Sequence, residues 1–443
     1  MNRRHFLQKS VFAGSTLLAP SFSIGAAGAN ARIGVAIVGI HDRGMDLAQE
    51  CARIPNVDIR YLADPDSRLF EERLKMIEGW GRPRPKCVQD FRSLLDDPDL
   101  HAIFIATPDH WHALATILAC QAGKDVYVEK PTSHNVWESR KMVEVARKYN
   151  RVVQVGTQNR SAEYCQQAVD YVRSGKLGDV HFIRIMNSKQ RESLAPAVNT
   201  APPEGVDYNL WLGPAPERPY SASRFHYNWH WFWDYSGGDI INDGVHQIDL
   251  ARWVANRTVP KAVSSTGATY VLNDGRDTPD TQTVTWEFEG LTMVLEQALW
   301  TPFLKKVPLD KRDSGQMPNW TFDGTRIEVY GTKQFMFFGR MGGGYQIFDA
   351  DGNSVAQQPR KFAPACTAHV GEFIECVKSR KKPSADIEEG HYSTALAHYG
   401  NIAFRVGRRL HLDETKECFV GDDEAQPLLK RGGREGFTVP DSV

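Results

Sequence analysis

Short apolar runs alternate with segments of helical spacing between residues 33 and 155. The run at 33–38 is continuously apolar and ends at Gly39, which is typical of a strand buried on both faces. Further strands are expected at 57–63, 102–106, 125–128 and 152–155, and helices at 44–53, 67–80, 91–95, 110–121 and 136–149. This alternation predicts an α/β fold with an N-terminal, doubly wound parallel sheet of the Rossmann type.

The pattern changes after residue 160. One helix is expected at 161–174, and strands then dominate, at 180–186, 262–270, 282–288, 292–297, 325–330, 334–338 and 345–348. Helices return at 367–378 and 388–409. Several strands in succession imply a second α/β domain with a large, open, mostly antiparallel sheet. We therefore divide the chain into segments 1–29, 30–158 (Rossmann domain), 159–385 (second domain) and 386–443 (C-terminal helix and tail).

The first segment has the features of an export signal. Arg3-Arg4 is followed by Phe6-Leu7, residues 10–31 carry no charge, and the small residues Ala27-Gly28-Ala29 precede Asn30. The arginine pair resembles a twin-arginine signal, which predicts the twin-arginine translocase as a partner and an exported, periplasmic protein. The uncharged stretch is too rich in Gly, Ser and Ala for a stable membrane anchor.

Composition narrows the remaining classes. The 443 residues suffice for two domains, and the net charge of −1 gives no reason to expect a nucleic-acid or anionic-membrane partner. The seven cysteines are far apart and form no CxxC pair, so we expect mostly buried, reduced thiols. The histidines show none of the spacings of a metal site, and no metal is expected.

The turn after the first strand resembles part of a dinucleotide fingerprint. In the turn Gly39-Ile40-His41-Asp42-Arg43-Gly44, glycine fills the first and sixth places of GxGxxG, while the third is His41. Asp64 ends the second strand, where a carboxylate can accept hydrogen bonds from ribose hydroxyls and would repel the 2′-phosphate of NADP. The alternatives are an ordinary strand–helix turn and an Asp-Pro turn residue, and the latter role is compatible with ribose binding.

Four stretches together carry a family resemblance. The turn 39–44 is followed in order by 106–113 (ATPDHWHA), by Glu129-Lys130-Pro131 and by 237–249 (GGDIINDGVHQID). The chain thus resembles the glucose–fructose oxidoreductase/inositol dehydrogenase/MocA (Gfo/Idh/MocA) family over nearly all of its length after the signal. The resemblance implies an NAD- or NADP-dependent oxidoreductase acting on sugars or polyols, with the open sheet face making a dimer or tetramer contact. Asp64 favours NAD.

The resemblance also implies the roles of particular residues. Lys130 would contact the reacting oxygen beside the nicotinamide, with Pro131 in cis as in many relatives, and His246 would be the acid/base. Asn242 stands where the family usually has Asp, and it cannot transfer a proton. The expected cofactor contacts are Gly39, His41, Arg43, Gly44, Asp64, Thr107, Pro108, His110, His112, Glu129, Lys130 and Gln158, and the expected substrate contacts are Arg160, Trp229, His230, Asp243 and His246.

Other interpretations of these residues remain open. Lys130 could be an exposed lysine before a turn, and His246 could be a structural histidine facing Asp249. The aromatic run at 227–233 could stack on a sugar or only fill the core. Outside the cytoplasm free NAD should be scarce, which favours tightly held cofactor and redox-neutral chemistry, such as epimerisation or glycosidic cleavage through a transient ketone. A non-catalytic carbohydrate-binding protein is the further alternative, because His41 and Asn242 depart from the family pattern.

Overall fold

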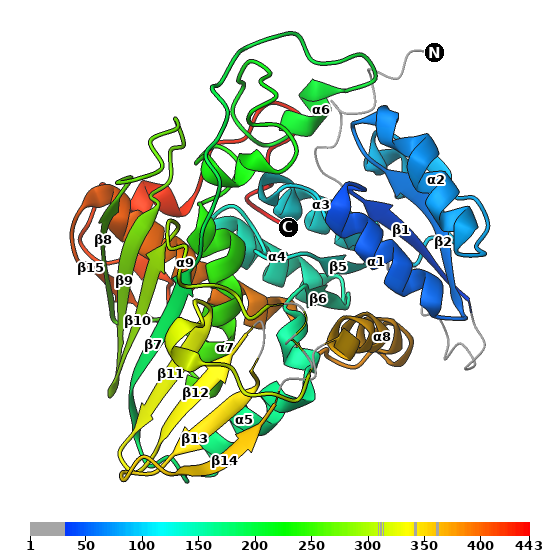
Figure 1. The fold of residues 1–443 in the computed structure, drawn as a ribbon. Coiled ribbons are helices and arrows are strands. Elements are labelled where there is room, and N and C mark those ends of the chain that lie inside the picture. Colours follow the sequence, from blue (N-terminus) through cyan, green and yellow to red (C-terminus); the bar gives the residue numbers. More distant parts are fainter. Residues whose placement is uncertain (1–31, 309, 311, 313, 341–342, 360–362) are drawn as a thin grey trace, which may run out of the picture. The chain divides into compact units, whose positions relative to one another are not determined.

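The computed structural model describes residues 32–443 except 309, 311, 313, 341–342 and 360–362 (Figure 1). The predicted export signal at 1–29 lies outside the described residues. None of the helices in the described part of the chain has a stretch long and apolar enough to cross a membrane. Four of the seven cysteines, Cys51, Cys120, Cys165 and Cys376, are buried.

The first sheet is the predicted parallel Rossmann sheet. Its order is β3-β2-β1-β4-β5-β6, and every neighbouring pair is parallel. The strands are β1 (Ile33–Val38), β2 (Val57–Ala63), β3 (Lys86–Val88), β4 (Ala102–Ile105), β5 (Asp125–Val128) and β6 (Val153–Val155). The helices between them are α1 (Asp42–Arg53), α2 (Phe70–Gly79), α3 (Asp109–Gln121) and α4 (Val136–Lys148). Strand β3 was not predicted, because three partly exposed residues give no apolar run.

The second sheet has ten strands in the order β14-β13-β12-β11-β7-β10-β9-β8-β15-β16. Its strands are β7 (Val180–Ser188), β8 (Ala262–Ala268), β9 (Thr281–Phe288), β10 (Leu291–Ala298), β11 (Arg326–Gly331), β12 (Phe335–Gly339), β13 (Tyr345–Phe348), β14 (Ser354–Gln358), β15 (Leu410–Asp413) and β16 (Cys418–Phe419). All neighbours are antiparallel except β7 and β10, so the predicted mostly antiparallel sheet is confirmed. Strands β14, β15 and β16 were not predicted.

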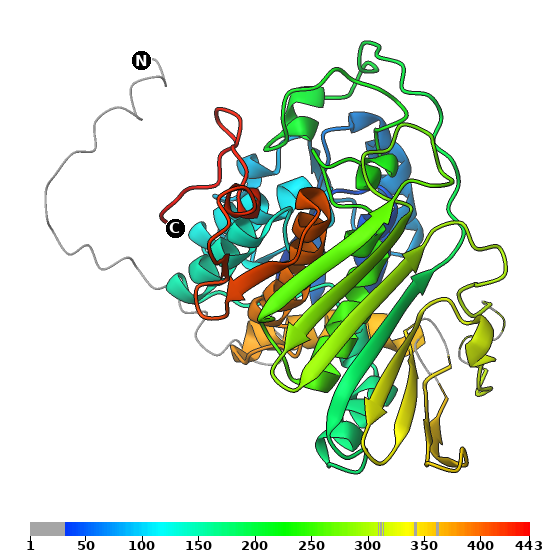
Figure 2. The same cartoon turned by 90° about the vertical axis from the view of Figure 1, so that its left-hand side faces the viewer.

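Helices cover one face of the second sheet, as Figure 2 shows. Buried and less buried residues alternate along β9 and β10, which is the period of a sheet with one face in the core. The buried face packs against α5 (Glu163–Arg173), α7 (Val245–Ala255) and α9 (Ile387–Val406) in one apolar cluster. Within it the indole of Trp286 donates to the main-chain oxygen of Leu396 at 2.9 Å.

The C-terminal part of the chain contributes to both cores. Helix α8 (Ala363–Ser379) packs its Phe373 and Ile374 into the cluster that contains Ile33 of β1. The tail residues Phe437 and Val439 belong to the cluster of α3 and α4. The hydrophobic core of each domain therefore combines segments that are distant in the sequence. Residues 386–443 pack against both sheets.

Candidate active site

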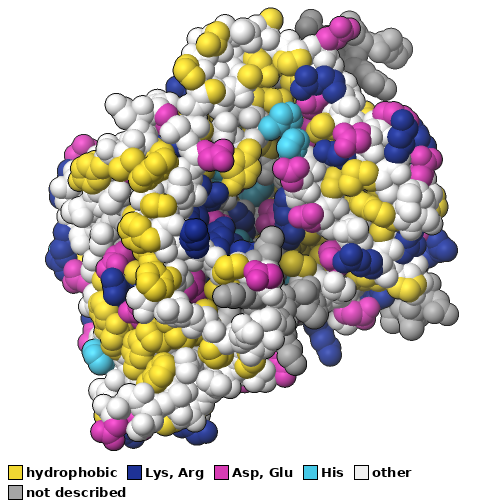
Figure 3. Space-filling model, viewed as in Figure 1, with side chains coloured by type: hydrophobic (Ala, Val, Ile, Leu, Met, Phe, Trp, Pro, Cys, Tyr) yellow, Lys and Arg dark blue, Asp and Glu magenta, His cyan; other side chains and the backbone are white. Residues whose placement is uncertain are grey.

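A cleft of about 440 Å³ lies between the carboxyl ends of the Rossmann strands and the second domain. Ligands in open parallel sheets bind at this edge, where the strand order reverses between β1 and β4. Figure 3 shows the hollow, with Lys and Arg side chains gathered in it. The predicted residues that line it are Gly39, His41, Arg43, Asp64, Thr107, Pro108, His112, Glu129, Lys130, Gln158, Trp229, His230, Asn242, Asp243 and His246.

The turn between β1 and α1 requires glycine at both of its predicted positions. Gly39 has φ +83°, and a Cβ there would lie 2.6 Å from the main-chain oxygen of Ala106. A Cβ on Gly44 would lie 1.8 Å from the main-chain oxygen of Gly39. Gly44 thus acts through packing of α1 and is not itself part of the cleft lining.

His41, at the third place of the turn, does not fill the space beside the turn where a cofactor diphosphate would bind. Its half-exposed ring stacks on His226 of the second domain, with 4.6 Å between the ring centroids. The first turn of α1 has no side-chain cap, so its N–H groups remain available to an anion. The β1–α1 turn therefore fits the diphosphate of a dinucleotide, although glycine is missing at its third place.

Asp64 stabilises this turn. Its Oδ2 accepts from the Ile40 N–H at 2.9 Å and its Oδ1 from the Asp66 N–H at 2.9 Å. Burial raises the pKa of Asp64 to about 6. The predicted turn role is present, and since each carboxylate oxygen can accept a second bond, a ribose hydroxyl contact remains compatible with it.

Glu129 connects three parts of the Rossmann domain. It accepts from Arg43 Nε at 2.7 Å, from Gln158 Nε2 at 3.1 Å and from the Lys130 N–H at 3.1 Å. Burial alone would raise the pKa of Glu129, but Arg43 and Lys130 beside it hold that pKa below its usual value. Arg43, Glu129 and Gln158 therefore form one network behind Lys130.

Lys130 points from the end of β5 to the second domain. Its Nζ donates to the main-chain oxygen of Asn242 at 2.8 Å and to Asn242 Oδ1 at 3.2 Å. The peptide bond between Lys130 and Pro131 is cis, as the resemblance implied. Burial lowers the pKa of Lys130, although Asp243 and Glu129 oppose that change. Lys130 is thus a partly buried cation in the cleft lining and not an exposed lysine before a turn.

His246 lies on α7 and lines the same cleft. Burial first, and then the nearby Arg340 and Lys130, hold its pKa well below the ordinary value. Its ring is therefore neutral near pH 7, and its unprotonated nitrogen can act as a base toward a substrate hydroxyl during the reaction. In the described part of the chain no hydrogen bond joins it to Asp249, whose carboxylate accepts from Arg160 and Ser393.

The structure does not bring Arg160 and His110 to the cleft lining. Arg160 is buried in an ion cluster with Asp249, 2.8 Å away, and Glu389, 3.2 Å away, so its guanidinium is already used and the predicted substrate contact is not supported. His110 is fully buried and donates from Nε2 to the main-chain oxygen of Trp211 at 2.9 Å. Its position supports packing and not the predicted cofactor contact.

The aromatic run divides between the cleft and the core. Trp229 and His230 line the cleft and stack at 3.6 Å between centroids. Trp231 and Phe232 are buried in a separate apolar cluster. The stacked pair can therefore face a ligand, while the following residues only pack.

Residues 189–236, here the covering segment, close the cleft over the Rossmann domain. Ser67 N–H donates to the main-chain oxygen of Gly205 at 3.0 Å, and His226 Nε2 lies 3.2 Å from Asp66 Oδ2. Leu210, Trp211 and His226 of this segment line the cleft. Apart from the aromatic run at 227–233, its sequence has no motif and no strand pattern, so these contacts were not predicted.

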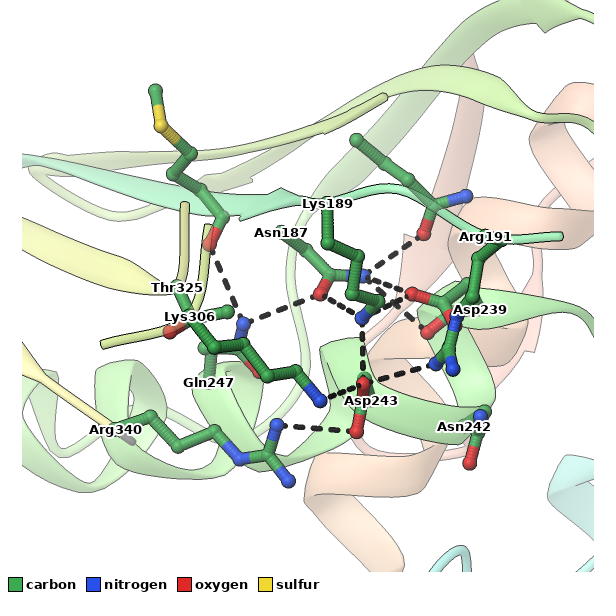
Figure 4. Close-up of polar contacts among 12 residues, drawn as sticks. Asn187, Lys189, Arg191, Asp239, Asn242, Asp243, Gln247, Lys306, Thr325 and Arg340 are labelled. Carbon is green, nitrogen blue, oxygen red and sulfur yellow. Dashed lines mark hydrogen bonds and ion pairs between the residues drawn. The ribbon is translucent and has the colours of Figure 1, made fainter. Parts of the chain in front are cut away.

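Four cations near Asp243 were also missed. Lys189, Arg191, Lys306 and Arg340 each form an ion pair with Asp243 (Figure 4). They come from separate segments and share no sequence spacing that could have indicated a site. Among the described residues, no group of three or more His, Cys, Asp and Glu side chains could hold a metal ion.

Comparisons with known proteins match both domains. A model described as "Oxidoreductase family, NAD-binding Rossmann fold" (Gfo/Idh/MocA) matches residues 27–157, and its companion, "Oxidoreductase family, C-terminal alpha/beta domain", matches 189–274 and 320–439. Myo-inositol 2-dehydrogenase of Thermotoga maritima is 22% identical over 393 residues, which cover 86% of this chain and 99% of that protein.

Two further similarities are more limited. A glycosyl hydrolase family 109 protein of Shewanella pealeana is 24% identical over 168 residues, 33% of this chain and 37% of that protein. Among solved structures, levoglucosan dehydrogenase in complex with NADH and levoglucosan has a TM-score of 0.63 at 18% identity, covering 86% of this chain and 99% of that one. This last similarity concerns the fold.

Proposed function

Because this chain belongs to the Gfo/Idh/MocA family of NAD-binding oxidoreductases, we propose that it oxidises a secondary hydroxyl of a sugar, glycoside or polyol. NAD, held by the β1–α1 turn and Asp64, would supply the hydride acceptor. The observation that carries the proposal is the meeting of Lys130 and His246 in one cleft beside that turn.

Lys130 and His246 divide the handling of the proton. The neutral imidazole of His246 accepts the proton of the substrate hydroxyl, and the Lys130 ammonium stabilises negative charge that develops on the same oxygen. His246 is buried and Lys130 is partly buried, so these interactions are stronger than they would be in water. Asn242 orients Lys130 through its two oxygens and transfers no proton itself.

A redox-neutral reaction is the second candidate. The covering segment restricts exchange of a bound dinucleotide, and the predicted export would take the protein away from free NAD. The partial similarity to a glycosyl hydrolase family 109 protein supports cleavage or epimerisation through a transient ketone. In that case the hydride returns to the sugar within one turnover, and a proton next to the ketone exchanges with solvent.

An absorbance measurement tests the proposal. NAD-loaded protein is mixed with sugars, polyols and glycosides, and reduction of the cofactor is followed in the near ultraviolet. Net oxidation gives a stable NADH signal. A redox-neutral reaction gives no net signal: a change next to the transient ketone incorporates deuterium from heavy water, and epimerisation at the oxidised carbon gives a different sugar without deuterium, which chromatography detects. NADH, deuterium and a new sugar all absent with every compound, in protein that binds sugars, would favour the non-catalytic alternative.

A further inference from the structure

Two carboxylates meet four cations at the second-domain side of the cleft (Figure 4). Asp243 Oδ2 accepts from Lys189 at 2.6 Å, from Arg191 at 3.0 Å and from Lys306 at 2.8 Å. The other oxygen, Oδ1, accepts from Arg340 at 3.1 Å. Asp239 also pairs with Lys189 and Arg191. We call Lys189, Arg191, Lys306 and Arg340 the cation group.

Sheet topology explains why these side chains meet. Strands β7 and β10 are parallel, and β12 runs in the same direction because β11 is antiparallel to both β7 and β12. The carboxyl ends of all three strands therefore lie at one edge of the sheet. Lys189 and Arg191 follow β7, Lys306 lies beyond β10, and Arg340 follows β12.

The charges of this group do not balance. Asp239 and Asp243 supply two negative charges against four positive charges. Burial first, and then the neighbouring Lys189 and Arg340, lower the pKa of Lys306 to about 8, although Asp243 opposes that change. The same cations hold the pKa of Asp243 well below its usual value, so both carboxylates are already ionised. An excess of partly buried positive charge is energetically costly unless a bound anion neutralises it.

The excess charge reaches the cleft through Arg340, which lines it together with Lys130 and His246. Lys306 does not line the cleft itself but pairs with Asp243, which does, and its side chain is 28% exposed. In the described part of the chain, the side chain of Arg340 makes one hydrogen bond, from Nη1 to Asp243, so other N–H groups of its guanidinium can bind a further acceptor. A planar guanidinium suits the oxygens of a carboxylate, phosphate or sulfate.

We propose that the substrate is an anionic sugar, whose carboxylate, phosphate or sulfate is held by Arg340 and Lys306 while its hydroxyl lies between Lys130 and His246. This inference rests on the proposed function and specifies its substrate class. The anion would orient one end of the sugar, which selects the carbon presented for oxidation. Asp243 positions the two cations and does not contact the anion.

The test measures binding separately from turnover. Calorimetry on NAD-loaded protein compares glucose with glucuronate, gluconate, glucose 6-phosphate and glucose 6-sulfate, and galactose with galacturonate. At least one anionic sugar should bind roughly tenfold or more tightly than its neutral counterpart, as expected for charged hydrogen bonds. The preference should weaken with added salt, and the anion that binds best identifies the oxyanion.

Variants test which residues produce the preference. Arg340→Met and Lys306→Met should each reduce it several-fold without changing NAD affinity. Lys305→Met removes the same charge from the adjacent exposed position and should leave the preference unchanged. Equal binding of neutral and anionic sugars in the parent, or an undiminished preference in both the Arg340 and the Lys306 variant, would overturn the inference.

Failure of this inference and failure of the proposed function give different results. If neutral sugars reduce the cofactor as well as anionic ones and bind equally, the oxidoreductase function stands and the anion site does not. If anionic sugars bind preferentially but no sugar is oxidised or exchanges deuterium, the anion site stands and the proposed chemistry does not.

Discussion

Lys130 Nζ lies 2.8 Å from the main-chain oxygen of Asn242, although 112 residues separate the two along the chain. Lys130 ends a strand of the first sheet, and Asn242 lies in the π-helical turn η6 (Ile240–Gly244) that precedes α7. The candidate catalytic cation is therefore oriented by the domain opposite to its own. Its orientation depends on the two domains packing together.

Replacing Lys130 or His246 should impair chemistry and leave folding intact. We expect Lys130→Ala and His246→Ala each to lower turnover by roughly 10²–10⁴-fold, the usual range for acid–base groups. NAD affinity, measured by fluorescence titration, should largely survive His246→Ala because the imidazole acts on the substrate. The exposed His181→Ala is the matched control. Near-parent turnover in both cleft variants would refute the assignment.

Asn242→Asp should change the pH profile through Lys130. Burial lowers the pKa of Lys130, so the ammonium form is lost as pH rises through that lowered pKa. A carboxylate at residue 242 favours the ammonium and raises this pKa, so the alkaline limb of kcat/KM should move to higher pH. Steady-state rates across pH give the shift, with Asn242→Ser as the uncharged control. An unmoved limb would mean that Lys130 does not set it.

Asp64→Ala should narrow or reverse a preference for NAD over NADP. The carboxylate would face the 2′-phosphate of NADP at close range, and its removal takes away that repulsion. Calorimetry with both cofactors measures the preference. Because Asp64 also holds the Ile40 and Asp66 N–H groups, Asp64→Asn serves as a second variant that removes the charge but keeps an acceptor. Equal weakening of both cofactors would leave Asp64 only its turn role.

Loosening the covering segment should speed the release of NAD. His226→Ala removes the contacts with His41 and Asp66, and Gln89→Ala removes a bond to the main-chain oxygen of Gly205. Stopped-flow fluorescence should show faster dissociation in both variants. Ser223→Ala changes a contact within the segment and is the control. Unchanged rates in both variants would show that the segment does not retain the cofactor.

The export signal predicts a processing defect. Replacing Arg3 and Arg4 together by Lys should trap uncleaved protein in the cytoplasm, because the twin-arginine pair is recognised by the translocase. Cell fractionation and N-terminal sequencing report the outcome, with a mature end near Asn30 expected for the parent. Normal export of the double variant would exclude the twin-arginine pathway.

Much of the fold could be predicted because it depends on local patterns. The run at 33–38, the helix spacing at 136–149 and the alternation at 282–297 each report burial through their own period. The short strands β3, β14, β15 and β16 were missed, since strands of two to five residues, three of them at sheet edges, are too short to establish such a period. Their pairing is decided by neighbouring strands.

Part of the candidate site could also be predicted from short stretches of the sequence. Gly39 and Gly44 are required by close approaches within one turn. Lys130 was identified by its family resemblance, in the motif Glu129-Lys130-Pro131 that follows a buried strand. The roles expected of Arg160 and His110 were inferred from resemblance alone, and the structure instead shows an ion pair with Asp249 and a hydrogen bond to Trp211. Partner choice for a buried polar group depends on which segment packs opposite it.

The sequence by itself predicted two α/β domains and the dinucleotide turn, and its family resemblance indicated the candidate pair Lys130 and His246. Only the tertiary structure decided that Lys306 and Arg340, 63 and 97 residues from Asp243, share its carboxylate. Periodicity and turn chemistry act over a few residues and can be read along the chain. Electrostatic pairing across such separations depends on the strand order that brings the ends of β7, β10 and β12 to one edge of the sheet.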